Sequence, residues 1–164
     1  SFFVDKKPVH KITYPIGLMD IVELPPIKKQ FRVTPTKKGL ALIDISEKEA
    51  GLKPCAITGK TLVKNGKIQL HFHDGTTLVV DKDAYAVGDT LLISLPDHKI
   101  KKALSRAKGN MGLIVAGRHA GNTGTIKEVT VGTATRPSQT EIGDFETLTD
   151  YLFVIGEKEP AFTL

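Results

Sequence analysis

The sequence predicts a mainly β protein, and three observations support that fold class. Short apolar runs recur along the chain, turn-forming Gly, Pro, Asn and Asp separate them, and only one short stretch carries helix signals. About ten short strands with such turns are typical of barrels or sandwiches. The 164 residues, 40% hydrophobic and 25% charged, are enough for one ordinary domain or two small ones.

The first elements are strands followed by the one helix. Strands are expected at residues 19–24, 30–33 and 40–45, and the last of these is expected to be buried. Ser46 and Glu49 have the spacing of a capping box, in which each side chain satisfies a backbone amide of the other. Gly51 and Pro54 then end the helix.

The remaining elements are predicted to be strands. Asn65-Gly66 is a strong hairpin signal, because a type I′ turn needs positive φ at both central positions. Asp74-Gly75 is a second turn of this kind. Residues 99–104 fit either a strand or a short helix. The other expected strands are residues 56–63, 67–72, 76–80, 90–95, 110–116, 125–131 and 151–155.

The elements group into two predicted units, a central β domain over residues 8–108 and a smaller barrel over residues 109–158. Residues 1–7 read as the end of a preceding domain, and residues 159–164 as a tail. Since the first residue is not Met, we expect the chain to be a fragment of a longer one.

Composition excludes several classes of protein. The single cysteine, Cys55, rules out an internal disulfide and a multi-cysteine zinc site. No apolar run approaches the roughly 20 residues of a membrane-spanning helix, and the N-terminus lacks the order of a signal peptide. A cytosolic location without membrane contact is the default expectation.

Charge is unevenly distributed along the chain. Residues 1–40 carry +5, residues 41–98 carry −2, residues 99–136 carry +7 and residues 137–164 carry −5. Two basic blocks could present a positive face to a polyanion, although a solvated surface explains many lysines equally well. The acidic residues Glu141, Asp144, Glu146 and Asp150 would repel phosphate, so we expect them to face solvent or a basic partner protein.

The most specific stretch is residues 111–129, MGLIVAGRHAGNTGTIKEV. Two apolar strands bracket a loop with Gly117, Gly121 and Gly124, and Arg118 and His119 stand between the glycines. Glycine permits close backbone approach, and arginine binds phosphate through two parallel hydrogen bonds. Such a loop can lie against a sugar-phosphate backbone, or it can be only a tight turn of a small barrel.

This stretch resembles a KOW motif, the strand–loop–strand element of small SH3-like barrels in ribosomal proteins and NusG-type transcription factors. Residues 14–22, YPIGLMDIV, resemble a signature of the small-subunit ribosomal protein family "S-four-e" of archaea and eukaryotes. Further similar segments are Phe31-Arg32, residues 39–42, residues 46–50, residues 87–90, Gly109-Asn110 and residues 153–156. The resemblance covers about residues 3–158.

The resemblance implies a family-specific central β domain followed by a KOW SH3-like barrel, with the family's N-terminal S-four-type RNA-binding domain truncated here. It implies a structural constituent of the small ribosomal subunit, located in the cytoplasmic ribosome, which binds rRNA and neighbouring ribosomal proteins and supports assembly and translation. No catalytic role, cofactor, metal or small-molecule substrate is expected. The family also favours an archaeal source.

Thirteen residues are candidates for rRNA contact, mainly through phosphates and RNA shape rather than base stacking. They are Arg118, His119, Asn122 and Lys127 in the KOW stretch, Lys99, Lys101, Lys102, Arg106 and Lys108 in the second basic block, and Lys6, Lys7, His10 and Lys11 near the N-terminus.

Three alternatives remain open. A KOW-bearing transcription elongation factor would contact polymerase more than RNA, and a protein-interaction barrel would carry its charge incidentally. A metal-binding enzyme could use His71 and His73, which share one face of a strand, with Cys55 or Asp74 as a third ligand. No Walker loop, HExxH motif or catalytic carboxylate pair supports an enzyme.

Overall fold

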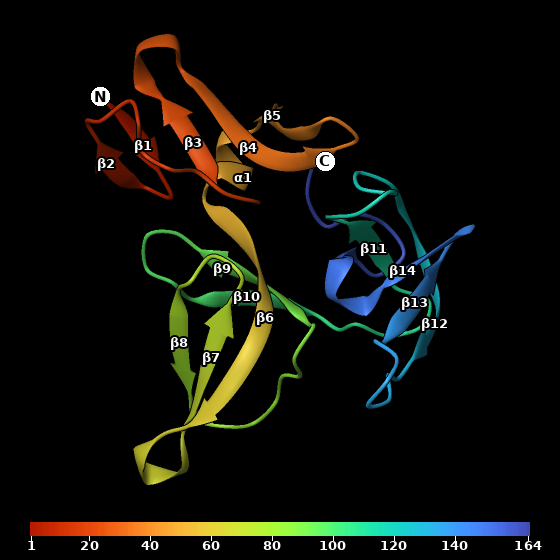
Figure 1. Cartoon of the computed structure of the whole chain (residues 1–164). Coiled ribbons are helices and arrows are strands. Elements are labelled where there is room, and N and C mark those ends of the chain that lie inside the picture. Colours follow the sequence, from red (N-terminus) through yellow and green to blue (C-terminus); the bar gives the residue numbers. More distant parts are fainter.

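Fifteen strands and little helix make up the protein, as the computed structural model of residues 1–164 shows (Figure 1). The strands form three five-stranded sheets in which all neighbouring strands are antiparallel. The predicted fold class, mainly β, is confirmed. None of the helices has the length and apolarity that a membrane-spanning helix needs.

The first sheet, red to orange in Figure 1, has the strand order β2-β1-β3-β4-β5. A 3-10 turn at Pro25–Ile27 connects its third and fourth strands, and the helix α1 (Glu47–Ala50) follows its last strand. The strands are β1 (Phe2–Val4), β2 (Lys7–Val9), β3 (Ile21–Leu24), β4 (Lys29–Thr36) and β5 (Gly39–Ile45).

The second sheet, yellow to green in Figure 1, has the order β10-β9-β6-β7-β8. Its central strand is the longest of the chain, and a turn at Lys64–Gly66 reverses it, with positive φ at Asn65 and Gly66 as the sequence predicts. The strands are β6 (Leu52–Leu62), β7 (Ile68–Phe72), β8 (Thr77–Val80), β9 (Thr90–Ser94) and β10 (Ile100–Leu104).

The third sheet, teal to blue in Figure 1, curls into a half-barrel with the order β14-β13-β12-β11-β15. A 3-10 turn at Thr149–Tyr151 returns the chain to the strand beside β11. The strands are β11 (Met111–Ile114), β12 (Thr123–Thr130), β13 (Gln139–Ile142), β14 (Phe145–Leu148) and β15 (Leu152–Gly156).

One buried apolar cluster joins all three sheets. It contains Met19 from the approach to β3, Leu92 from β9, Leu113 from β11 and Phe153 from β15. Phe162, from the C-terminal segment, packs into the same cluster. Burial of such side chains is favourable by about 1.5–3 kcal/mol each. This shared core therefore holds the sheets against one another.

One expectation about an individual element is wrong. Residues 40–45 are expected to be buried, but β5 is the edge strand of its sheet, and Leu40 and Leu42 are 58% and 50% exposed. Of the two alternatives left open for residues 99–104, the structure has the strand, β10 (Ile100–Leu104). The capping box is half formed: Ser46 Oγ accepts from Glu49 N, whereas the Glu49 carboxylate accepts from Thr163.

The division into residues 8–108 and 109–158 stays a prediction. Hydrogen bonding distributes the strands of residues 8–108 over two sheets. Residues 1–7 do not stand apart, because Phe2–Val4 pairs with both β2 and β3.

Candidate nucleic-acid interface

The loop between β11 and β12, residues 115–122, has a compact backbone that exposes Arg118. Gly121 N donates to Ile114 O at 2.8 Å, and Ile114 N donates to Asn122 O at 2.9 Å. Gly117 and Gly121 have φ of +80° and +86°, a region that favours glycine. The glycines thus close the loop tightly, and Arg118 is exposed with no carboxylate partner.

His119 and Asn122 are less exposed than Arg118. The imidazole of His119 lies against Phe145 of β14, with ring centroids 4.7 Å apart. Tyr151 packs over Gly117. Arg118, His119 and Tyr151 line a shallow hollow of about 330 Å³. Glu146 of β14, one of the acids expected to face away from phosphate, lines the same hollow. A polyanion that meets this loop would therefore meet one cation beside two ring systems and one carboxylate.

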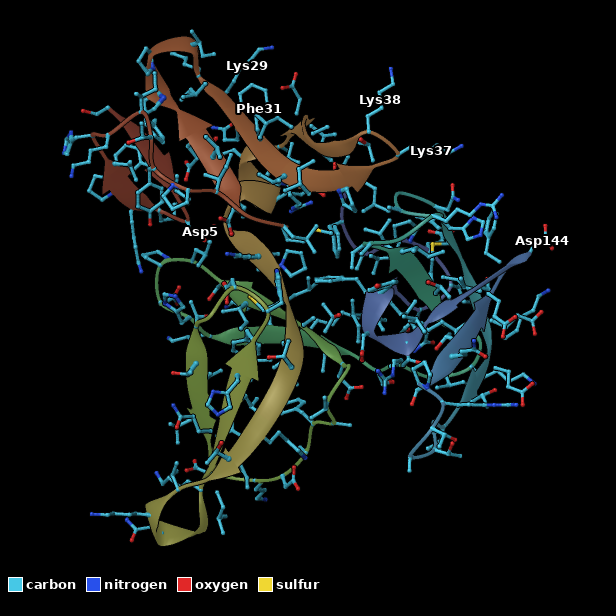
Figure 2. The ribbon with its side chains drawn as sticks, in the orientation of Figure 1. Asp5, Lys29, Phe31, Lys37, Lys38 and Asp144 are labelled. Carbon is cyan, nitrogen blue, oxygen red and sulfur yellow. The ribbon has the colours of Figure 1, made fainter.

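The same loop packs directly on the first sheet. A Cβ at Gly121 would lie 3.0 Å from the Cα of Thr36, at the end of β4. The turn that follows carries Lys37 and Lys38, both exposed and both without an ion-pair partner (Figure 2). Sequence reasoning missed these two lysines, because nothing in the sequence places residue 36 beside residue 121.

The second basic block lies away from Arg118. Lys102 and Lys108 line a hollow of about 730 Å³ together with Asn110 and the start of the C-terminal segment, which carries Glu157 and Glu159. Lys108 precedes β11, and Arg118 follows it. The two sets therefore lie at opposite ends of this strand and face different hollows.

The other members of this block have individual surroundings. Arg106 is half-buried, and its guanidinium lies over Gly88. Lys99 and Lys101 are exposed near Asp97. Backbone and Ser94 hydrogen bonds, with a smaller effect of the two lysines, lower the pKa of Asp97.

The N-terminal candidates divide into residues with a partner in the chain and residues without one. Lys6 forms an ion pair with Glu23 at 2.9 Å, and the His10 ring lies 3.2 Å from Ser1 Oγ. Lys7 and Lys11 are exposed without such partners. Lys7 lines a narrow cleft with His98, which brings it near the start of the second basic block.

Lys127 has acidic surroundings. Its Nζ is 3.4 Å from Glu141 Oε1, and the two line a hollow of about 510 Å³ with Glu128, Asp144 and Glu146. These carboxylates disfavour phosphate at Lys127. Three of the four acids expected on one face thus share a hollow, whereas Asp150 lines a different cleft.

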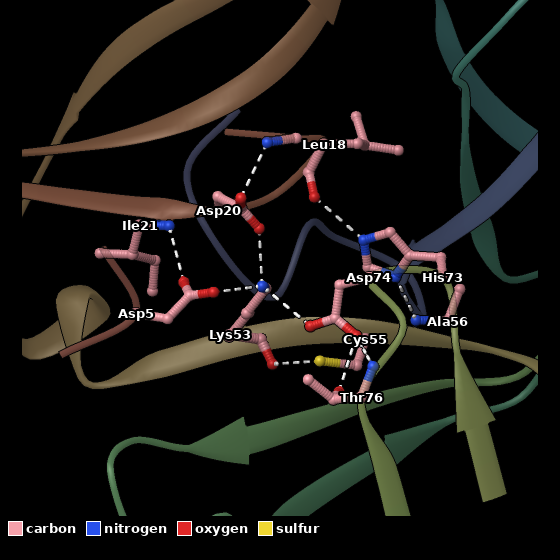
Figure 3. Close-up of polar contacts among 11 residues, drawn as sticks. Asp5, Leu18, Asp20, Ile21, Lys53, Cys55, Ala56, His73, Asp74 and Thr76 are labelled. Atoms are coloured by element: carbon pink, nitrogen blue, oxygen red, sulfur yellow. Dashed lines mark hydrogen bonds and ion pairs between the residues drawn. The ribbon is translucent and has the colours of Figure 1, made fainter. Parts of the chain in front are cut away.

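A buried cluster, the Lys53 junction, connects the first two sheets (Figure 3). It consists of Lys53 of β6, which is 3% exposed, and three carboxylates: Asp5 and Asp20 from the first sheet and its approach, and Asp74 from the turn after β7. The Nζ lies 2.6, 2.7 and 2.9 Å from Asp5, Asp20 and Asp74, so each N–H has one carboxylate partner.

The pKa shifts in the junction follow from these contacts. Burial opposes the charge of Lys53, but the three carboxylates outweigh it and raise the lysine pKa. Burial would raise the pKa of Asp74, but hydrogen bonds from Thr76 and Lys53, and the Lys53 charge, lower it to about 2. Lys53 and Asp74 are therefore both charged at neutral pH.

The residues that a metal-binding enzyme would use, His71, His73 and Cys55, make other contacts. His73 Nδ1 accepts from Ala56 N at 3.2 Å and Nε2 donates to Leu18 O at 3.0 Å, while burial lowers its pKa. His71 Nε2 lies 2.8 Å from Thr61 Oγ1. Burial raises the pKa of the Cys55 thiol to about 12. The structure has no cluster of three His, Cys, Asp or Glu side chains suited to a metal.

Comparison with known proteins identifies the family. The family model described as "Ribosomal family S4e" matches residues 27–100. The small ribosomal subunit protein eS4 of Methanosphaera stadtmanae is 37% identical over 166 residues, which cover 98% of this chain and 68% of that protein. The eS4 protein of Methanothermobacter thermautotrophicus is 38% identical, with 98% and 69% covered.

This chain belongs to ribosomal family S4e. A crystal structure of the 30S ribosomal protein S4e from Thermoplasma acidophilum superimposes with a TM-score of 0.85 at 30% identity, covering 95% of this chain and 80% of that one. The predicted resemblance is confirmed, and the fold agrees with it.

The segment that carries the S4e resemblance, residues 14–22, has structural roles in this chain. Met19 is fully buried in the cluster that joins the sheets, Leu18 O accepts from His73, and Asp20 binds Lys53. Tyr14 and Ile16 are instead 45% and 41% exposed. The part of the signature after residue 17 therefore fixes the position of the first sheet.

Proposed function

We propose that this S4e chain is a structural constituent of the small ribosomal subunit, that it binds rRNA, and that it has no catalytic role. Its relatives are named as small ribosomal subunit proteins, which supports the same assembly for this chain. Its partners would then be rRNA and neighbouring ribosomal proteins in the cytoplasmic ribosome.

The observation that carries the proposal is Arg118. This exposed guanidinium stands on a loop closed by glycines, with no carboxylate in ion-pair range. An unpaired guanidinium can form two parallel hydrogen bonds to a phosphate, and it releases a condensed counterion when it does so. The binding would read the RNA backbone and its shape.

The other candidate residues for rRNA contact differ in how exposed and how free of ion pairs they are. Lys7, Lys11, Lys99, Lys101, Lys102 and Lys108 are exposed without an ion-pair partner. His119, Asn122, Arg106, Lys6, His10 and Lys127 are partly covered or paired within the chain, and for these a structural role competes with RNA contact.

The test measures the dissociation constant for a transcript of archaeal small-subunit rRNA across a range of salt concentrations. We expect Arg118→Ala to weaken binding by about 5- to 10-fold and to reduce the salt slope by about one unit. Arg136→Ala, which removes an exposed arginine from the loop after β12, is the matched control. Equal dissociation constants for wild type and Arg118→Ala would overturn the role of Arg118.

A protein-interaction barrel with incidental charge makes a different prediction. In that case the wild-type chain binds the transcript weakly at low salt, and added salt changes the affinity little. This outcome would overturn the proposed rRNA binding itself.

A further inference from the structure

The β4–β5 turn and the β11–β12 loop come from different sheets but are in direct contact. A Cβ added to Gly121 would lie 3.0 Å from Thr36 Cα and 3.2 Å from Pro35 O. Backbone this close to backbone leaves no room for a side chain between the two segments. Lys37, the residue after Thr36, is therefore adjacent to the loop. On the other segment, the Cα of Arg118 lies within about 11 Å of the Cα of Gly121, because three residues of extended chain span no more.

The turn holds its lysines in a defined conformation. Thr36 Oγ1 donates to Gly39 O at 2.8 Å, and Lys38 N donates to Thr36 Oγ1 at 3.3 Å. Lys37 and Lys38 point outward from the tip of this turn (Figure 2). Their backbone is fixed by these bonds, so their side chains extend from a rigid base.

Lys37 and Lys38 at the β4–β5 turn have no ion-pair partner, unlike the lysine at the other end of the same hairpin. There, Lys29 lies 3.4 Å from Asp44. Lys37, Lys38 and Arg118 have no carboxylate within ion-pair distance. Three cations without an ion-pair partner thus stand on two segments whose backbones meet at Gly121 and Thr36, although Glu146 lines the hollow of Arg118.

We propose that Lys37, Lys38 and Arg118 form one composite site for an RNA phosphate backbone, the hairpin-loop site. This inference rests on the proposed rRNA binding and extends it to a turn outside the KOW stretch. The two sheets hold the backbone that carries the three cations in place before RNA arrives, so less backbone freedom is lost on binding than with independent flexible loops. Lysine and arginine on adjacent segments can then follow successive phosphates of one strand.

The first test compares two charge-matched double variants of the full chain. Lys37→Ala with Lys38→Ala should weaken binding to the small-subunit rRNA transcript by about 10- to 50-fold and reduce the salt slope by about 1.5–2 units. Lys64→Ala with Lys82→Ala is the control, because both lysines are exposed and unpaired and lie near the β6–β7 turn, at the far end of the second sheet (Figure 1). The control should change binding by less than about threefold.

The results separate the two proposals. If Arg118→Ala weakens binding but the Lys37/Lys38 variant behaves like the control, the hairpin-loop site is wrong and rRNA binding stands. If wild type binds the transcript without salt dependence, the proposed function fails as well. Unfolding curves of each variant identify any loss of binding that comes from loss of folding.

The second test asks whether both segments face the same RNA. Cys55 is the only cysteine and is 2% exposed, so an iron chelate can be attached selectively to Leu40→Cys or to Thr123→Cys, neither of which removes a proposed RNA contact. Hydroxyl radicals from both positions should cleave overlapping nucleotides of the bound transcript. Cleavage in separate RNA segments, or none from position 40, would overturn a shared site.

Discussion

Replacing Lys53 should reveal how strongly the Lys53 junction holds the first two sheets together. Lys53→Met keeps the aliphatic stem but leaves Asp5, Asp20 and Asp74 together without their cation. Removing one partner of a buried ion pair costs about 3–5 kcal/mol. Since the three carboxylates retain some solvent contact, we expect a loss near the lower end, about 3 kcal/mol at pH 7.

The pH dependence gives the sharper prediction. The pKa of Asp74 is lowered from 3.8 to about 2, which corresponds to at most about 2 kcal/mol of stability, since solvent screens part of the interaction. Because the folded-state pKa is the lower one, this contribution is complete above pH 4 and is lost as the pH falls towards 2. In Lys53→Met the carboxylates repel one another, and protonation relieves that repulsion. The difference in unfolding free energy between wild type and Lys53→Met should therefore shrink by half or more as the pH falls from 7 to 3.5.

Urea denaturation followed by circular dichroism measures both effects, since the chain has no tryptophan. Lys67→Met is the matched control, because Lys67 pairs with an 81% exposed Asp81 at 3.0 Å and should contribute less than about 1 kcal/mol. Equal losses for the two variants, or a Lys53→Met deficit that does not change with pH, would refute this account of the junction.

Three further predictions concern backbone, tail and thiol. Gly121→Ala should lower stability by about 2–3 kcal/mol, more than Gly75→Ala, because both have positive φ but only Gly121 is crowded; equal losses in thermal unfolding contradict this. Arg32→Met should expose the C-terminal segment to proteolysis, since buried Arg32 donates to Thr163 O at 2.9 Å; an unchanged cleavage rate contradicts this. Native Cys55 should resist alkylation at pH 8, because burial raises its pKa to about 12; rapid labelling contradicts this.

The sequence predicted local elements better than their assembly. Asn65-Gly66 specifies its turn through positive φ, and alternation identifies strands such as β4, because both signals lie within a few residues. The exposure of Leu40 and Leu42 could not be predicted, since it depends on β5 being at the sheet edge.

The candidate site, too, could be predicted from the sequence only in its local part. The glycines around Arg118 identify the loop, but its neighbours depend on contacts between residues far apart in the sequence. The KOW resemblance grouped Lys127 with Arg118, whereas pairing of β12 with β13 places Lys127 beside Glu141. The candidate list omitted Lys37 and Lys38, because only the contact between Thr36 and Gly121 brings their turn to the loop.

Stability and RNA binding should respond to different residues of this protein. The groups that join the sheets are buried and paired: Lys53 with its three carboxylates, and His73 between Ala56 and Leu18. Exposed, unpaired cations such as Lys37, Lys38 and Arg118 contribute little to folding, because no folded-state partner stabilises their charge. Their positions relative to one another nevertheless depend on how the sheets pack. Loosening the Lys53 junction should consequently weaken RNA binding without removing a single RNA contact, whereas neutralising the surface cations should weaken binding and leave unfolding unchanged.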